Sequence, residues 1–240
     1  MISKFRTLLA VTLSSLIILS GCASQPPEPV SLTPTILQSR DLKVGVAMTA
    51  IPQADTHQMG ADCLLCAAAA ATGMAKLTKH VKTLPSENLP QIKDEIATLL
   101  KQRGVEAIVI PDSIEVDDLP KFEGSLPNAA ARDYSAYKTK YGIDKLIVID
   151  IQMLGTFRTY AAYVPTSDPK GVIRGAGYLV DLSSNSYDWY LPLDVTKASN
   201  EDWDEPPSFP GLTNAYFQAI EIGRATLEKP FTEIPLAATK

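Results

Sequence analysis

Apolar residues recur with helical spacing after Ser86 and with strand spacing soon afterwards. Ser86 suits an N-cap position, and the apolar face that follows consists of Leu89, Ile92, Ile96 and Leu99. Gly104 stands just past this segment, where a residue with positive φ ends many helices. The pattern therefore predicts a helix between Ser86 and Gly104, followed by a strand over residues 105–110.

A second region of the chain has the pattern of several strands in succession. Four consecutive apolar residues, Leu146 to Ile149, predict a central strand that is buried on both faces. Residues 156–164 can continue this strand, residues 172–182 return after a turn, and residues 187–191 add a further strand. We therefore expect an antiparallel meander late in the chain.

The remaining segments complete the predicted order of elements. Residues 44–48 indicate an early strand, and an Ala-rich helix is expected over residues 60–81. A short helix is expected over residues 132–141 and a closing helix over residues 212–229. The buried stripe expected on the closing helix consists of Ala215, Ala219, Ile222 and Leu227. The order β-α-α-β-α-β-β-β-α predicts a single α+β domain.

The first 22 residues have the pattern of a secretory signal and not of a membrane span. Lys4 and Arg6 give a positive start, residues 8–19 form an apolar run broken only by small Thr and Ser, and Gly21 precedes Cys22. About 20 consecutive apolar residues are needed to cross a bilayer, so the run is too short. Its charge, length and small final residue are typical of a cleaved leader.

The sequence Leu19-Ser20-Gly21-Cys22 resembles the lipobox of bacterial lipoproteins. This resemblance implies that residues 1–21 are removed, that the Cys22 thiol carries a diacylglycerol, and that its freed amine is acylated. Each buried methylene contributes about 0.8 kcal/mol, so two or three chains hold a protein on a membrane where one chain does not. Ala23 follows where retention in the inner membrane favours Asp, which implies the periplasmic face of the outer membrane. An ordinary thiol at Cys22 is the alternative.

Composition limits the classes of partner. Removal of the leader takes away two cations and no acids, so the net charge changes from −5 to −7. An acidic chain without a basic stripe is not expected to bind nucleic acid, nor to attach to anionic lipid through charge. We expect residues 22–41 to be a Pro-rich tether, residues 42–230 a globular domain and residues 231–240 a C-terminal tail.

The order of elements has a parallel among known envelope proteins. Residues 141–144 lead into the buried strand, a hairpin joins residues 178–182 to Trp189, and a helix closes the chain. Over residues 42–230 these features resemble periplasmic proteins related to the N-terminal domain of TolB and to the curli-secretion lipoprotein CsgG. The resemblance implies a non-catalytic scaffolding or assembly role in the envelope or an export complex, with an envelope protein partner or self-association.

Cys63 and Cys66 are the candidates for redox chemistry. A C-x-x-C at a helix N-terminus is the arrangement used for thiol–disulfide exchange. However, Asp62 places a negative charge beside Cys63, which disfavours the thiolate, and Leu64 and Leu65 have the character of packing surface. A static disulfide is the favoured interpretation in an oxidising compartment. Thiol oxidoreductase activity and buried free thiols are the alternatives.

A metal site can be drawn from Asp55, His57, Cys63 and Cys66. Zinc prefers four nitrogen or sulfur ligands, and the whole chain has two histidines. We therefore interpret His57 as a loop residue and expect no metal, no cofactor and no catalytic residue. A small-ligand or metal-binding lipoprotein remains the third hypothesis, beside the scaffolding lipoprotein and the thiol oxidoreductase.

Overall fold

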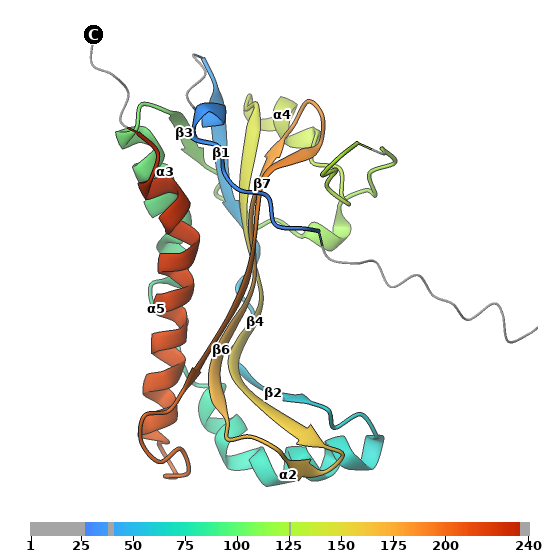
Figure 1. The fold of residues 1–240 in the computed structure, drawn as a ribbon, viewed down its shortest axis with the longest axis vertical. Helices are drawn as coiled ribbons and strands as arrows, with labels where there is room; N and C mark the ends of the chain where they lie inside the picture. Colours follow the sequence, from blue (N-terminus) through green and yellow to red (C-terminus); the bar gives the residue numbers. More distant parts are fainter. Residues whose placement is uncertain (1–26, 38–40, 125, 236–240) are drawn as a thin grey trace, which may run out of the picture.

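Seven strands form one mixed sheet in the part of the chain that the structure describes, residues 27–37, 41–124 and 126–235. In this computed structural model the main path through the sheet is β3-β1-β4-β6-β7, and β2 and β5 also pair with β4 (Figure 1). The strands are β1 Lys43–Met48, β2 Asp55–Met59, β3 Glu106–Val109, β4 Lys145–Ala161, β5 Val164–Pro165, β6 Lys170–Asp181 and β7 Ser186–Ala198. Cys22 and the leader lie outside the described residues.

Strand β4 organises the sheet. Along one edge its first half pairs in parallel with β1 and its second half in parallel with β2. Along the other edge it pairs antiparallel with β6, which pairs antiparallel with β7. The late antiparallel meander and the α+β class are therefore confirmed. The parallel pairing of β1 with β3 and β4 joins segments about 60 and 100 residues apart, and the sequence pattern does not specify it.

The core lies on both faces of the upper sheet. Leu146, Ile147, Val148 and Ile149 are each 0% exposed, as expected for a strand buried on both sides. Ile147 and Ile149 belong to the cluster under α3 (Ile92–Gln102) and α5 (Pro210–Thr232). Leu146 and Val148 belong to the opposite cluster, which is covered by α4 (Ala136–Tyr141) and the loops before it (Figure 1).

Helix α2 (Leu64–Val81) lies at the far end of the long strands, across the lower part of the sheet (Figure 1). Its buried stripe follows the helical period and consists of Cys66, Ala70, Met74, Leu77 and Val81. The Nη1 atom of Arg158 on β4 lies 3.3 Å from the Met74 sulfur, so this stripe faces the distal half of β4. We call α2, β2 and the distal parts of β4, β5 and β6 the distal lobe.

The predicted helix after Ser86 has a different beginning. A 3-10 turn, Leu89–Gln91, comes first, and α3 begins only at Ile92 with no side-chain cap at Gln91. Glu87 has φ +48°, outside the helical region, and Pro90 lacks the N–H that a helix begun at Ser86 would need for its first hydrogen bond. The end is as expected, since Gly104 has φ +83°.

Two further expectations about the elements are wrong. His57 does not lie in a loop but in β2, a strand of mostly polar residues. The sequence pattern does not predict this strand, which forms by pairing with β4. Ile222 is 46% exposed on α5, whereas Gly223 faces Ile173 of β6 and takes its place in the buried stripe. Two adjacent stripes are compatible with the spacing on this helix, and the shape of β6 selects the one that contains Gly223.

The packed part of the chain is longer at both ends than residues 42–230. Val30 forms an antiparallel bridge with Tyr190, with both backbone hydrogen bonds at 2.9 Å, and Leu37 is 1% exposed. At the other end Phe231 and Ile234 are fully buried. Apolar residues in the expected tether and tail therefore belong to the core. None of the described helices is long and apolar enough to cross a bilayer.

Candidate functional site

The first turn of α2 is closed by a disulfide between Cys63 and Cys66. Their Cα atoms are 4.9 Å apart, and the Cys63 Sγ accepts a hydrogen bond from the backbone N–H of Cys66 at 2.9 Å. Cys63 is exposed at the N-cap position, whereas Cys66 is 8% exposed and belongs to the buried stripe. The bond therefore fixes the start of the helix to its own buried face.

The two residues between these cysteines are not packing surface. Leu64 is 88% exposed and Leu65 is 81% exposed, so the sequence-based expectation for them is wrong. A helix has one buried stripe here, and the stripe through Cys66 and Ala70 turns the preceding two leucines outward. Leu64 and Leu65 are the two most exposed large hydrophobic side chains among the residues that the structure describes.

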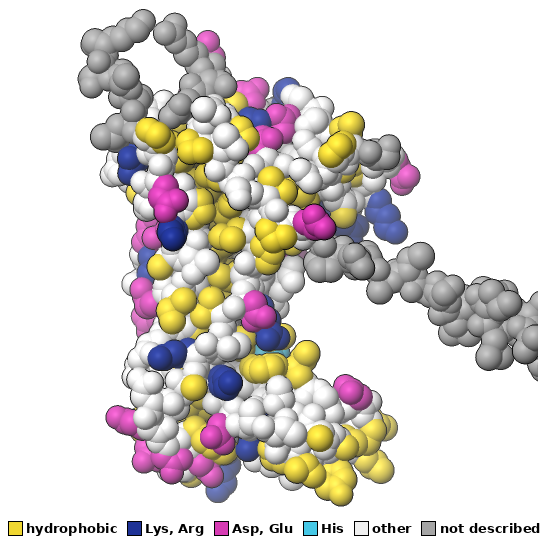
Figure 2. Space-filling view, in the orientation of Figure 1, with side chains coloured by type: hydrophobic (Ala, Val, Ile, Leu, Met, Phe, Trp, Pro, Cys, Tyr) yellow, Lys and Arg dark blue, Asp and Glu magenta, His cyan; other side chains and the backbone are white. Residues whose placement is uncertain are grey.

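Other exposed apolar side chains lie beside these leucines. Met59 at the end of β2 is 48% exposed, and the hairpin between β4 and β5 presents Tyr163 at 67% and Val164 at 52%. Met59 pairs with Thr159 of β4. Two residues further along, at the end of β4, Ala161 pairs with Val164. Figure 2 shows apolar side chains gathered over this corner of the distal lobe. We call Met59, Leu64, Leu65, Tyr163 and Val164 the apolar tip.

The proposed metal ligands are engaged elsewhere. His57 Nε2 lies 3.1 Å from the backbone oxygen of Leu154, and Asp55 forms an ion pair with Lys82 at 3.2 Å. Cys63 and Cys66 have no free thiolates because they are bonded to each other. Among the residues that the structure describes, no group of three or more His, Cys, Asp and Glu side chains is arranged to hold a metal ion.

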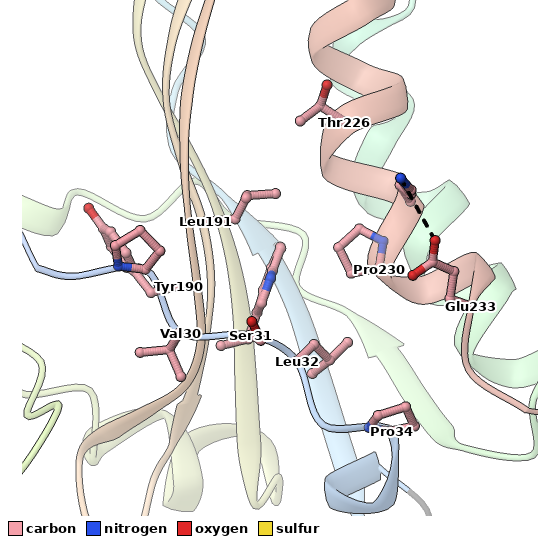
Figure 3. A pocket seen from close by; sticks show the side chains of 12 residues that line it. Val30, Ser31, Leu32, Pro34, Tyr190, Leu191, Thr226, Pro230 and Glu233 are labelled. Atoms are coloured by element: carbon pink, nitrogen blue, oxygen red, sulfur yellow. Dashed lines mark ion pairs between the residues drawn. The ribbon is translucent and has the colours of Figure 1, made fainter.

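A pocket of about 360 Å³ lies where the N-terminal segment crosses β7 and the end of α5 (Figure 3). Val30, Leu32 and Leu191 line one side of it, and Pro230 lines the other. Its ion pair, Lys229 to Glu233, spans 3.9 Å within one helical turn. The pocket is a mostly apolar seam between the segment before β1 and the core, and the bridge of Val30 to Tyr190 holds that segment against the domain.

A cluster of charges between α3 and α5 changes ionisation on folding. Arg224 Nη2 contacts Glu95 at 2.5 Å and lies 3.7 Å from Glu228. Burial would raise the pKa of Glu95, but hydrogen bonding to Arg224 holds it below its usual value. Burial, together with the nearby Glu95 carboxylate, raises the pKa of Glu228 to about 7. Glu228 therefore binds a proton more tightly in the folded chain than in the unfolded chain.

This cluster predicts a pH-dependent stability. Because the folded pKa of Glu228 lies above its unfolded value, its stabilising contribution is complete below the unfolded pKa and is lost as pH rises toward 7. Glu228→Gln should therefore stabilise the protein more at pH 8 than at pH 5, by on the order of 1–3 kcal/mol. Urea unfolding at both pH values measures the difference.

Glu221→Gln is the matched control, because Glu221 contacts the same Arg224 at 3.2 Å but its side chain is 63% exposed. We expect the effect of this variant to be nearly the same at both pH values. If Glu228→Gln, like Glu221→Gln, changes the free energy of unfolding by the same amount at pH 5 and at pH 8, Glu228 does not take up a proton on folding.

Comparison with known proteins gives distant likenesses of fold. No protein-family model matches the chain, and no curated protein matches its sequence. Three similar solved structures are the PelC dodecamer from Paraburkholderia phytofirmans, protein XCC0632 from Xanthomonas campestris and lipoprotein GNA1162 from Neisseria meningitidis. Their TM-scores are 0.33, 0.37 and 0.27, and their sequence identities 11%, 13% and 12%. The matches cover 88%, 85% and 75% of this chain and 96%, 90% and 99% of the others. Likeness at this level does not establish a shared function.

Proposed function

We propose that this chain is a lipid-anchored protein of the cell envelope that acts by binding and positioning, not by catalysis. The observation that carries the binding role is the apolar tip, where Leu64 and Leu65 are 88% and 81% exposed. Side chains of this size are seldom left so exposed in a cluster unless another surface covers them. The leader and Cys22, which resemble a lipobox, support the anchor.

The finer parts of this proposal concern location and partners. The residue after Cys22 supports the periplasmic face of the outer membrane, and the likeness to the TolB N-terminal and CsgG group supports a scaffolding or assembly role. Both rest on resemblance in sequence. The packed segment Val30–Leu37 shortens the free tether, so that the domain is held close to the membrane that carries Cys22.

Thiol oxidoreductase activity is the second candidate, because Cys63 is exposed at the N-terminus of α2. Exchange requires a thiolate that attacks a substrate disulfide, and Cys63 becomes one only when its bond to Cys66 is reduced. The two functions therefore make opposite predictions for the same pair of cysteines.

A variant with Cys63→Ala and Cys66→Ala separates these two candidates. For a binding protein we expect unchanged membrane fractionation and a lower Tm, with a loss of at most about 2 kcal/mol because the disulfide closes a very short loop. The wild-type protein should catalyse the reduction of a protein disulfide by dithiothreitol no faster than the variant. Faster turnover by the wild type would establish the oxidoreductase instead.

A further inference from the structure

Helix α2 has apolar residues on the face that the domain does not cover. The buried stripe through Met74 faces β4, while the opposite face begins with Leu64 and Leu65 and continues through exposed alanines, Ala68, Ala69 and Ala75. Residues 64–71 of α2 are apolar on all sides, whereas the second half of the helix carries Lys76 and Lys79. A helical segment that is apolar on all sides is normally covered on all sides. The outward face of residues 64–71, together with the apolar tip, is therefore a surface built to be covered.

The geometry of the chain shows what lies within reach of this surface. Val30 is bridged to Tyr190, and eight residues further along β7 Ala198 pairs with Lys170. Lys170 pairs with Phe157, whose neighbour Arg158 contacts α2. Eight residues of strand span about 26 Å, so the middle of α2 at Met74 lies at about this distance along β7 from the bridge, and Leu64 lies about 15 Å further along the helix.

The chain between Cys22 and Val30 has the same reach. It also contains eight steps, which span at most about 26–29 Å when extended. The described chain before Val30 leaves β7 on the side of the sheet opposite to α3 and α5 (Figure 1). Helix α2 begins on this same side, next to the end of β2 (Figure 1). A leaflet that borders this side of the domain can therefore hold the acyl chains of Cys22 and contact the apolar tip.

Charge around the tip also suits a lipid surface. From Thr56 to Ala75 the single charged residue is Asp62, and residues 159–167 contain none. The acidic loop of residues 201–205 precedes Pro206 and Pro207, which line a groove with Lys76 and Lys79 at the opposite end of α2. Leu64 and Lys79 are separated by about 22 Å of helix. The acids are thus kept away from the corner that presents the leucines.

We propose that the apolar tip lies in the membrane leaflet that holds the acyl chains of Cys22. This inference rests on the lipid anchor of the proposed function. The domain then makes two attachments to one leaflet, a covalent one through Cys22 and an apolar one through Leu64, Leu65 and Tyr163. The second attachment fixes the orientation of the domain, so that α5, on the opposite side of the sheet, faces away from the membrane (Figure 1).

The test uses the full acylated protein in vesicles of phosphatidylethanolamine and phosphatidylglycerol. Leu65→Trp places a fluorophore at the tip, and Ile222→Trp places one at a 46% exposed apolar position on α5. Emission is compared with that of the wild type in vesicles with and without brominated acyl chains, which quench tryptophan only in the hydrocarbon region. We expect a blue shift and several-fold stronger quenching for Leu65→Trp than for Ile222→Trp.

The outcomes separate this inference from the function on which it rests. Mass spectrometry of the purified protein first establishes whether Cys22 is acylated, and an unmodified Cys22 contradicts the anchor. If Cys22 is acylated and Leu65→Trp is quenched no more than Ile222→Trp, the anchor stands and the inference is wrong. A blue shift without quenching, accompanied by a doubled mass in light scattering, also overturns it, because a second copy then covers the tip.

Discussion

Replacing Cys22 with Ser is expected to release the protein from the membrane fraction. A hydroxyl cannot form the thioether, so the variant lacks the diacylglycerol that the lipobox resemblance implies, and the apolar tip alone is a small surface. A single acyl chain already gives only marginal binding, so the loss of every chain should leave weak, reversible attachment. Membrane fractionation, combined with mass spectrometry of the amino-terminal peptide, measures the result.

Ser24→Ala is the control for this experiment, because it alters a residue next to Cys22 and keeps the thiol. It should fractionate with membranes and carry the acyl mass. If Cys22→Ser is found in the same membrane fraction as Ser24→Ala, or if the wild-type amino terminus retains its leader, the lipoprotein assignment is wrong.

Replacing Gly155 with Val is expected to detach β2, and α2 that follows it, from β4. Gly155 has φ +135°, and a Cβ at this position would overlap the backbone of its β2 partner Asp55. A side chain therefore cannot be added without separating β2 from β4. Because this backbone strain alone costs about 1–3 kcal/mol and the overlap adds to it, we expect a loss of at least about 3 kcal/mol. Hydrogen exchange over residues 55–81 should become many-fold faster.

Gly73→Ala is the matched control within the same lobe. Nothing lies within 4 Å of a Cβ built at Gly73, which is in the interior of α2. Alanine should stabilise the helix by about 0.5–1 kcal/mol, because it reduces the freedom of the unfolded chain. Unchanged exchange in β2 and α2 of Gly155→Val would mean that the β2–β4 pairing does not hold the lobe.

The features that were predicted correctly from the sequence depend on residues close together in the chain, and those that were missed depend on distant contacts. The strand Leu146–Ile149 and the end of α3 at Gly104 are set by neighbouring residues, and both are found as expected. The antiparallel meander also depends on short connections. Strand β2 has no apolar pattern of its own and exists because Asp55 meets Gly155, 100 residues away.

The candidate site shows the same division. The C-x-x-C spacing and the helix that follows it are visible in the sequence, and these place Cys63 and Cys66 in the first turn of α2. The direction in which Leu64 and Leu65 point is not visible, because it depends on which stripe of the helix β4 covers. The Ala-rich composition of the segment offers several equivalent stripes, and only Met74 and Leu77 distinguish them.

The sequence by itself determined the class of the domain and its buried central strand, because these depend on local runs of residues, and the anchor at Cys22 stays a prediction from the sequence. The tertiary structure alone decided that residues 30–37 join the core, that β2 lengthens the sheet and that two leucines are presented at the tip. Each of these depends on contacts between segments distant in sequence, whose packing selects one of several arrangements that the local patterns allow.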